Sequence, residues 1–169
     1  METWEYPPRR ILVPVDFGEA SAKAVNVASM LAQEFGSELE VLHVEVLDAP
    51  PYFTHDQVAA LQAQRRNARA AAERHVRRFA EQHGAVDALV VVADGAAGDV
   101  ILSHAGNTDA IVMGTNDRGR AARLWMGSVA ERVSRHASVP VLVVHAGGTH
   151  GLLDYVRQLA EDARRRRNG

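Results

Sequence analysis

The sequence predicts an α/β domain in which a mostly parallel sheet carries helices on both faces. Short apolar segments with strand character alternate with helical segments from Arg10 to His145. Sheets of this kind are covered on both faces, and they bind ligands beyond the carboxyl ends of strands where the strand order reverses. The 169 residues suffice for one domain with a substantial core, and we expect no second domain.

The composition narrows the class of protein. Hydrophobic residues make up 47% of the chain and charged residues 24%, which is ordinary for a globular protein and excludes global disorder. The sequence contains no cysteine, so disulfides, thiolate metal sites and redox-active thiols are excluded. The net charge of −2 argues against a nucleic-acid partner.

Neither the first residues nor any later apolar run predicts membrane insertion. The opening METWEYPPRR lacks a basic start followed by an apolar segment, which a secretory signal would need. No apolar run approaches the roughly 18 residues that span a bilayer. We therefore expect a soluble, cytoplasmic protein without a membrane partner.

The first strand begins at Arg10 with RILVPVD. Pro14 cannot donate a backbone hydrogen bond, so the last residues of the strand should leave regular pairing and Asp16 should open a loop. A helix is predicted from Ala20 to Phe35 because apolar residues recur at spacings of three and four, and Gly36 provides a stop.

The second strand is predicted over Ser37 to Leu47, with Leu39 and Val41 on one face and Leu42 and Val44 on the other. The prolines that follow mark a connection from Asp48 to His55.

A long alanine-rich helix follows. Thr54 and Gln57 form a capping-box pattern at its start, and the pattern ends near Gln82. Its several arginines resemble a nucleic-acid surface, but Glu73 and Glu81 interrupt them and no aromatic residues are interleaved. We interpret this face as a solvated helix surface.

The remaining elements are shorter. The pattern predicts strands at Ala88 to Ala93, Ile111 to Met113 and Val139 to His145, and helices at Val100 to Ala105 and Val129 to His136.

The loop between Gly114 and Gly127 has the features of an anion site. It contains three arginines, and a helix that begins near Ser128 would present unpaired N–H groups and a positive dipole end. Gly127 would let a ligand approach the backbone closely. A structural alternative stays open, because Ser128 with Glu131 also matches a capping box.

Several motifs together are similar to one known family. ILVPVDFGEASAKAV, ELEVLHVEV, TDAIVMGT, RLWMGSVAERV and SVPVLVV follow one another in the order and at the spacing of the universal stress protein family. The resemblance covers Arg10 to Ala146. It implies an open, doubly wound five-stranded parallel sheet in the order 3-2-1-4-5, with strands 1 and 4 side by side. It also implies frequent homodimerisation and, in one branch, ATP binding.

The resemblance to that branch also implies a set of binding residues. Its loop pattern is glycine, two residues, glycine, nine residues, glycine and serine or threonine, and Asp117 replaces the middle glycine here. Asp16 and Val44 match the adenosine side of the family's pocket. The phosphate side is matched by Gly114, Gly127, Ser128 and Val129, and Asp117 lies in the same loop.

ATP binding depends on what Asp117 does in this loop. A carboxylate about 6 Å from one phosphate charge is unfavourable by roughly 0.7 kcal/mol in bulk water and about 3 kcal/mol at an effective dielectric of about 20. The loop arginines could offset this charge, or Asp117 could hold a phosphate-bound Mg²⁺. Equally, Asp117 could pair with the arginines and close the loop without a nucleotide.

Other functional classes fit less well. The eight histidines are dispersed without metal-ligand spacing, so we expect no metal site. No G-x-S-x-G pattern supports a hydrolase, and the only lysine, Lys23, lies outside any P-loop pattern. No residue has the features of a general base, so we expect no enzyme, although weak ATP hydrolysis stays open.

The chain therefore divides into an N-terminal extension over residues 1–9, a domain over 10–146, and a hinge with a basic C-terminal helix over 147–169. That helix should dock on its own domain or on a dimer partner. Two functions remain. The protein is a nucleotide-binding stress-response protein, or it is a dimeric interaction module without a ligand, paired through Val139 to His145.

Overall fold

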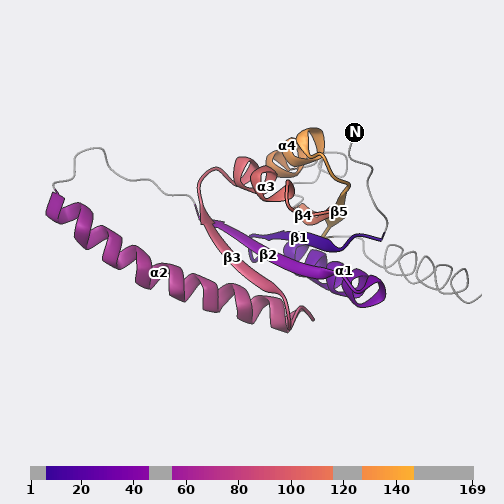
Figure 1. Ribbon diagram of the computed structural model, residues 1–169, viewed down its shortest axis with the longest axis horizontal. Helices are drawn as coiled ribbons and strands as arrows, with labels where there is room; N and C mark the ends of the chain where they lie inside the picture. The colour runs from indigo at the N-terminus through magenta and orange to yellow at the C-terminus, as the bar shows by residue number, and fades with distance from the viewer. Residues whose placement is uncertain (1–6, 46–54, 116–126, 147–169) are drawn as a thin grey trace, which may run out of the picture.

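The computed structural model describes residues 7–45, 55–115 and 127–146, and of residues 55–63, 65 and 66 it describes the backbone alone (Figure 1). Several expectations lie outside these residues. They concern Asp117 and the arginines of its loop, Thr54 of the first capping box, and the helix expected after Gly147. The interpretation of those segments stays a prediction.

Five strands alternate with four helices in the described part of the chain, as the hydrophobic periodicity predicts. The bounds are β1 Arg10–Val15, α1 Glu19–Phe35, β2 Glu38–Glu45, α2 His55–Gln82, β3 Leu89–Asp94, α3 Ala97–Ala105, β4 Ala110–Thr115, α4 Ser128–His136 and β5 Val141–His145. The bounds differ from the expected ones by a few residues. For example, β5 begins after Pro140, which has no N–H to donate to a ladder.

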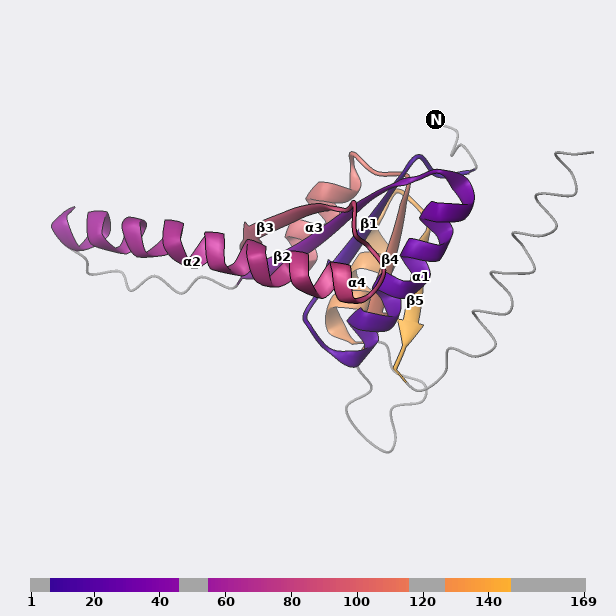
Figure 2. The same cartoon turned by 90° about the horizontal axis from the view of Figure 1, so that it is seen from below.

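The sheet is parallel and has the order β3-β2-β1-β4-β5, which confirms the order that the resemblance implied. Helices α1 and α2 cover one face, and α3 and α4 cover the other (Figures 1 and 2). Strands β1, β2 and β3 follow one another toward one edge of the sheet, and β4 then lies on the other side of β1, so the strand order reverses between β1 and β4. This is the switch point at which open α/β sheets bind ligands.

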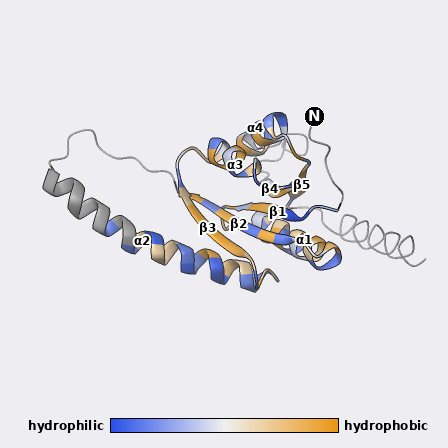
Figure 3. Cartoon of the chain, viewed as in Figure 1, coloured by the Kyte–Doolittle hydropathy of each residue, from blue (hydrophilic) through white to orange (hydrophobic). Residues whose placement is uncertain are grey.

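Two apolar layers hold the helices to the sheet, and Figure 3 shows the hydrophobic strands between the more polar outer helix faces. In β1, Ile11, Val13 and Val15 point to the α1 and α2 layer, whereas Leu12 points to the α3 and α4 layer. This alternation follows from the period of two in a strand. The predicted faces of β2 are also confirmed, since Val41 belongs to the first layer and Leu42 to the second.

The two central strands separate toward their carboxyl ends. β1 pairs with β4 only at Ile11 with Ala110 and at Leu12 with Ile111, whereas its pairing with β2 continues to Val15. Pro14 lies in the separated part of β1, where its missing N–H costs no hydrogen bond to β4. The predicted departure from regular pairing therefore occurs on the β4 side, and it opens a gap at the switch point.

No helix in the described ranges is long and apolar enough to cross a membrane.

Candidate functional site

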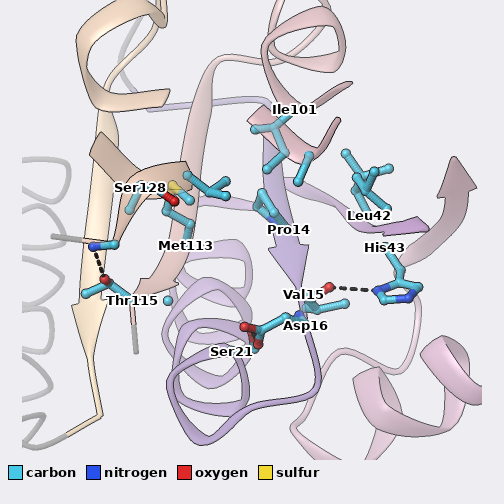
Figure 4. A pocket seen from close by; sticks show the side chains of 16 residues that line it. Pro14, Val15, Asp16, Ser21, Leu42, His43, Ile101, Met113, Thr115 and Ser128 are labelled. Carbon is cyan, nitrogen blue, oxygen red and sulfur yellow. Dashed lines mark hydrogen bonds between the residues drawn. The ribbon is translucent and has the colours of Figure 1, made fainter. Parts of the chain in front are cut away.

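A cavity of about 350 Å³ lies where β1 and β4 separate (Figure 4). Its walls come from the carboxyl ends of β1, β2 and β4 and from the amino-terminal turns of α1, α3 and α4. Of the seven expected binding residues, Asp117 lies outside the described residues. The other six line this single cavity: Asp16, Val44, Gly114, Gly127, Ser128 and Val129.

The inner part of the cavity is apolar. Leu42, Ile101 and Met113 are buried side chains that reach it from β2, α3 and β4. They belong to the layer between the sheet and the α3 and α4 pair. An apolar wall with polar groups at its rim is the usual arrangement of a small-molecule site.

Asp16 lies at the rim, held by its neighbours. Its Oδ1 accepts a hydrogen bond of 2.9 Å from the Gly18 N–H and one of 2.6 Å from the Ser21 hydroxyl. The Ser21 Oγ in turn accepts the Asp16 N–H at 3.0 Å. Asp16 therefore forms the strand-end turn that its residue type favours, and this turn orients the carboxylate at the cavity.

Phe17 follows Asp16 and adopts a left-handed backbone with φ of 63°. This conformation is strained for an aromatic residue, and such strain persists only where surrounding contacts impose it. Here the Phe17 ring packs at 4.5 Å from the ring of His43 and at 4.4 Å from that of His75 on α2. The contacts of Phe17 with β2 and α2 thus help to position Asp16.

His43 is a strand residue, as expected, and it also lines the cavity. Its Nδ1 lies 2.9 Å from the Val15 carbonyl oxygen (Figure 4). A carbonyl can only accept, so we assign the Nδ1 proton to this hydrogen bond. His43 thereby links the carboxyl end of β2 to that of β1, at the residue before Asp16.

Gly114 has a steric role that the loop pattern did not reveal. A β-carbon at this position would lie 2.4 Å from the Ala20 carbonyl carbon and 2.6 Å from the Ser21 nitrogen. Only glycine lets the first turn of α1 pack this closely on β4. The same approach places Ser21, and with it the Asp16 carboxylate, at the cavity.

The capping-box interpretation of Ser128 and Glu131 is wrong. Gly127 is the N-cap of α4, Ser128 is the first helical residue, and no side chain caps the helix. The Gly127 carbonyl accepts the Glu131 N–H at 2.9 Å, so the helix starts one residue earlier than a Ser128 cap requires. The Ser128 side chain is exposed at the cavity rim.

Thr115 is a site residue that sequence reasoning missed. The residue is 3% exposed, and its Oγ1 accepts the Gly127 N–H at 2.9 Å. Within the described residues the hydroxyl proton of Thr115 has no acceptor, so it is available to a ligand in the cavity. The available signal was a hydroxyl residue directly after Gly114 at the end of an apolar strand.

The described part of the cavity attracts anions mainly through backbone groups. Neither arginine nor lysine lines it, and the positive dipole ends at the cavity are those of the amino-terminal turns of α1, α3 and α4. The described ranges contain no group of three or more histidine or acidic side chains that could hold a metal ion.

Comparison with known proteins places this geometry in a family. The family model described as the universal stress protein family matches residues 7–145. The chain belongs to the universal stress protein family. It is 30% identical over 144 residues to a universal stress protein of Methanocaldococcus jannaschii, and the match covers 80% of this chain and 81% of that protein.

Solved structures of universal stress proteins share the fold. The universal stress protein UspA of Lactobacillus plantarum is 27% identical with a TM-score of 0.58, and the match covers 80% of this chain and 96% of that one. A universal stress protein solved in complex with cAMP is 24% identical with a TM-score of 0.58, and the match covers 83% of this chain and 99% of that one.

Proposed function

We propose that this universal stress protein binds an adenine nucleotide in the cavity between β1 and β4. The observation that carries the proposal is the convergence of six expected binding residues on one cavity of about 350 Å³ at the switch point. These residues lie in or directly beside β1, β2, β4 and α4, which are far apart in the sequence.

The chemistry of the walls suggests how a nucleotide would lie. The apolar wall of Leu42, Ile101 and Met113 suits the flat adenine ring. The Asp16 carboxylate is a hydrogen-bond acceptor and suits ribose hydroxyls, whereas a phosphate beside it would be repelled. The phosphates would then face the amino terminus of α4 and the Thr115 hydroxyl, on the β4 side of the cavity.

Further support comes from the family. One universal stress protein of the same fold was solved with cAMP, an adenine nucleotide. At 24% identity this likeness extends to the fold, and the residues of the present cavity carry the rest of the proposal.

The first experiment asks whether the protein carries a nucleotide. The purified full-length protein is denatured and the supernatant is analysed for adenine nucleotides. Adenosine, AMP and ATP are then titrated calorimetrically, ATP with and without Mg²⁺. Binding of adenosine or AMP supports the proposal. If none of the three ligands binds to the wild type or to Asp117→Gly, the proposal is wrong.

The variant Asp117→Gly tests how the carboxylate of the loop affects phosphate binding. If Asp117 repels the phosphates, the glycine variant should bind ATP more tightly by up to about a hundredfold, the equivalent of about 3 kcal/mol. Adenosine, which has no phosphate, should bind both forms equally. If Asp117 instead holds Mg²⁺, the variant should bind Mg·ATP more weakly.

The second candidate function is a dimeric interaction module. The contrast between the two edge strands of the sheet, β3 and β5, favours it. On the β3 edge, the Arg69 guanidinium of α2 donates to the Val92 carbonyl and lies 3.7 Å from the Asp94 carboxylate. On the other edge, β5 pairs with β4 alone within the described residues. An apolar strand at the edge of a sheet favours pairing with a second copy.

Light scattering over a range of protein concentrations tests this candidate. A dimer whose β5 amides exchange slowly with solvent would support pairing through Val141–His145. A monomer at every concentration would contradict it. Because nucleotide binding is measured separately, the two candidate functions succeed or fail independently.

A further inference from the structure

A second cavity lies at the amino-terminal ends of β2 and β3, whereas the nucleotide cavity lies at the carboxyl ends of the strands. It measures about 580 Å³ and is formed by the carboxyl-terminal half of α1, the start of β2 and the turn that leads from α2 into β3. None of its lining residues lines the nucleotide cavity. Whatever occupies this second cavity therefore does so independently of a nucleotide.

Exposed apolar side chains gather at this cavity. Three large hydrophobic residues are exposed within the described residues, and two of them, Val86 at 63% and Leu89 at 59%, line it. Leu39, Ala85 and Ala88 also line it and pack into the core behind it. Single exposed apolar residues are ordinary, but two that border one cavity mark a surface that another group covers.

The first described residues of the chain run along the rim of the same cavity. The Ser37 hydroxyl donates to the Pro8 carbonyl at 2.6 Å, and the Glu38 N–H donates to the Arg9 carbonyl at 2.8 Å. Ser37 and Glu38 both line the cavity, and Pro8 is itself buried. Residues 1–6 lie outside the described residues, but the point at which they join the domain is fixed at this rim.

The sequence of residues 1–6, METWEY, suits an apolar cavity. It contains two aromatic residues, Trp4 and Tyr6, although aromatic residues make up 5% of the whole chain. Pro7 and Pro8 follow, and a proline favours an extended backbone in the residue before it. Side chains alternate along an extended segment, so Trp4 and Tyr6 would share one side and Glu5 would point to the other.

Trp4 is close enough to Pro8 to reach across the cavity. Four extended residues span at most about 13–14 Å, at roughly 3.3–3.6 Å per residue. The far rim is nearer than that, because Leu89 of β3 pairs with Glu40 of β2 and neighbouring strands lie about 4.8 Å apart. A tryptophan also supplies the largest apolar surface of any side chain that this segment could place there.

We propose that the N-terminal segment folds back on its own domain and that Trp4 occupies this second cavity. The indole would cover Val86 and Leu89, and its N–H would donate to a carboxylate at the opening, that of Glu38 or Asp87. The segment of the same chain is favoured over that of a second copy because its attachment at the rim gives it a high effective concentration.

Tryptophan fluorescence of the full-length protein tests the proposal. The chain has two tryptophans, so Trp125→Phe leaves Trp4 as the only one. In this variant, the emission of Trp4 should be blue-shifted relative to the denatured form and protected from acrylamide quenching. If Trp4 is quenched as strongly as in the denatured protein, it is exposed and the proposal is wrong.

Val86→Asp, made in the Trp125→Phe variant, locates the tryptophan. A carboxylate in the apolar rim should expel the indole, so the emission should shift to the red and the protection from acrylamide should be lost. Val86 is an exposed residue, so the variant should fold. The matched control is Ser103→Asp at an exposed position of α3 outside the cavity, which should leave Trp4 protected. Unchanged emission in Val86→Asp would overturn the assignment.

Thermal melts provide a second readout through a double-mutant cycle. Trp4→Ala should lower the melting temperature by several degrees, and Glu5→Ala, on the other side of the segment, should not. Combined with Val86→Asp, Trp4→Ala should have little further effect, because the contact is already lost. An equal effect of Trp4→Ala in both backgrounds would place Trp4 away from Val86 and contradict the proposal.

Dilution distinguishes the chain's own segment from that of a second copy. A contact within one chain does not depend on protein concentration, so the emission of Trp4 and its protection from acrylamide should stay constant as the protein is diluted. If Trp4 becomes exposed on dilution while light scattering shows a dimer dissociating, the segment docks on the partner and the proposal is overturned.

Discussion

A β-carbon at position 114 would lie 2.4 Å from the carbonyl carbon of Ala20, so the backbones of β4 and α1 touch directly. Neither partner is a side chain that can rotate away. Gly114→Ala must therefore push α1 off the sheet, and we expect it to destabilise the protein by about 1–3 kcal/mol, as overpacked cores do. Because Ser21 moves with α1, adenosine binding should weaken too.

Gly106→Ala is the matched control for Gly114→Ala. Gly106 has an ordinary helical backbone, and the nearest heavy atom to its added β-carbon would be 3.6 Å away. Thermal melts of the two variants should differ by several degrees. Equal melting temperatures would contradict the close approach of α1 to β4.

Ser21→Ala should weaken adenosine binding without unfolding the protein. The Ser21 hydroxyl donates to Asp16 Oδ1 and accepts the Asp16 N–H, so its loss removes two of the hydrogen bonds that orient the carboxylate. We expect a stability loss of about 1 kcal/mol. Ser37→Ala removes another hydrogen bond of 2.6 Å, to the Pro8 carbonyl, and should cost similar stability while leaving binding unchanged. Calorimetry and denaturant melts separate the two effects.

Thr115→Val should affect phosphate more than adenosine. Valine keeps the shape of threonine but leaves the Gly127 N–H without its acceptor and removes the free hydroxyl proton. We expect AMP affinity to fall about tenfold or more and adenosine affinity to stay close to that of the wild type. Thr115→Ser should retain AMP binding. If Thr115→Val weakens both ligands equally, Thr115 supports the fold rather than the phosphate.

Glu40 and His104 connect β2 to α3 through a hydrogen bond of 2.6 Å between Oε1 and Nδ1. Glu40 is 8% exposed, so removing the imidazole leaves a buried carboxylate without this partner. We expect His104→Ala to lower the free energy of unfolding by about 1–3 kcal/mol. His136→Ala, at an exposed position of α4, should have a much smaller effect in the same denaturant titration. Equal effects would show that the Glu40 contact contributes little.

Local sequence patterns predicted the order and type of the secondary structure. The helix from Ala20 to Phe35 begins at Glu19, and its stop at Gly36 is confirmed, because that glycine adopts the left-handed conformation with φ of 71°. Asp16 follows β1 directly, as expected. These features depend on residues close together in the chain, so a single sequence contains their signal.

The start of α4 shows where a local pattern misleads. Ser128 and Glu131 have the spacing of a capping box, but Gly127 is the cap. The reason is tertiary. The Gly127 N–H is bonded to Thr115, twelve residues earlier at the end of β4, and this contact decides where the helix begins. Thr115 escaped sequence reasoning for the same reason, since its partner Gly127 becomes adjacent only in the fold.

By itself, the sequence determined the alternation of strands and helices, the two buried faces of the sheet and the position of Asp16 at a strand end, because periodicity and turn chemistry are local. Motif resemblance supplied the strand order. The tertiary structure decided how far β1 and β4 stay paired, why position 114 must be glycine and which residue caps α4. These three features depend on close contacts between backbone segments that are distant in the sequence. Because backbone groups are the same in nearly every residue, the residue types give no signal of such contacts.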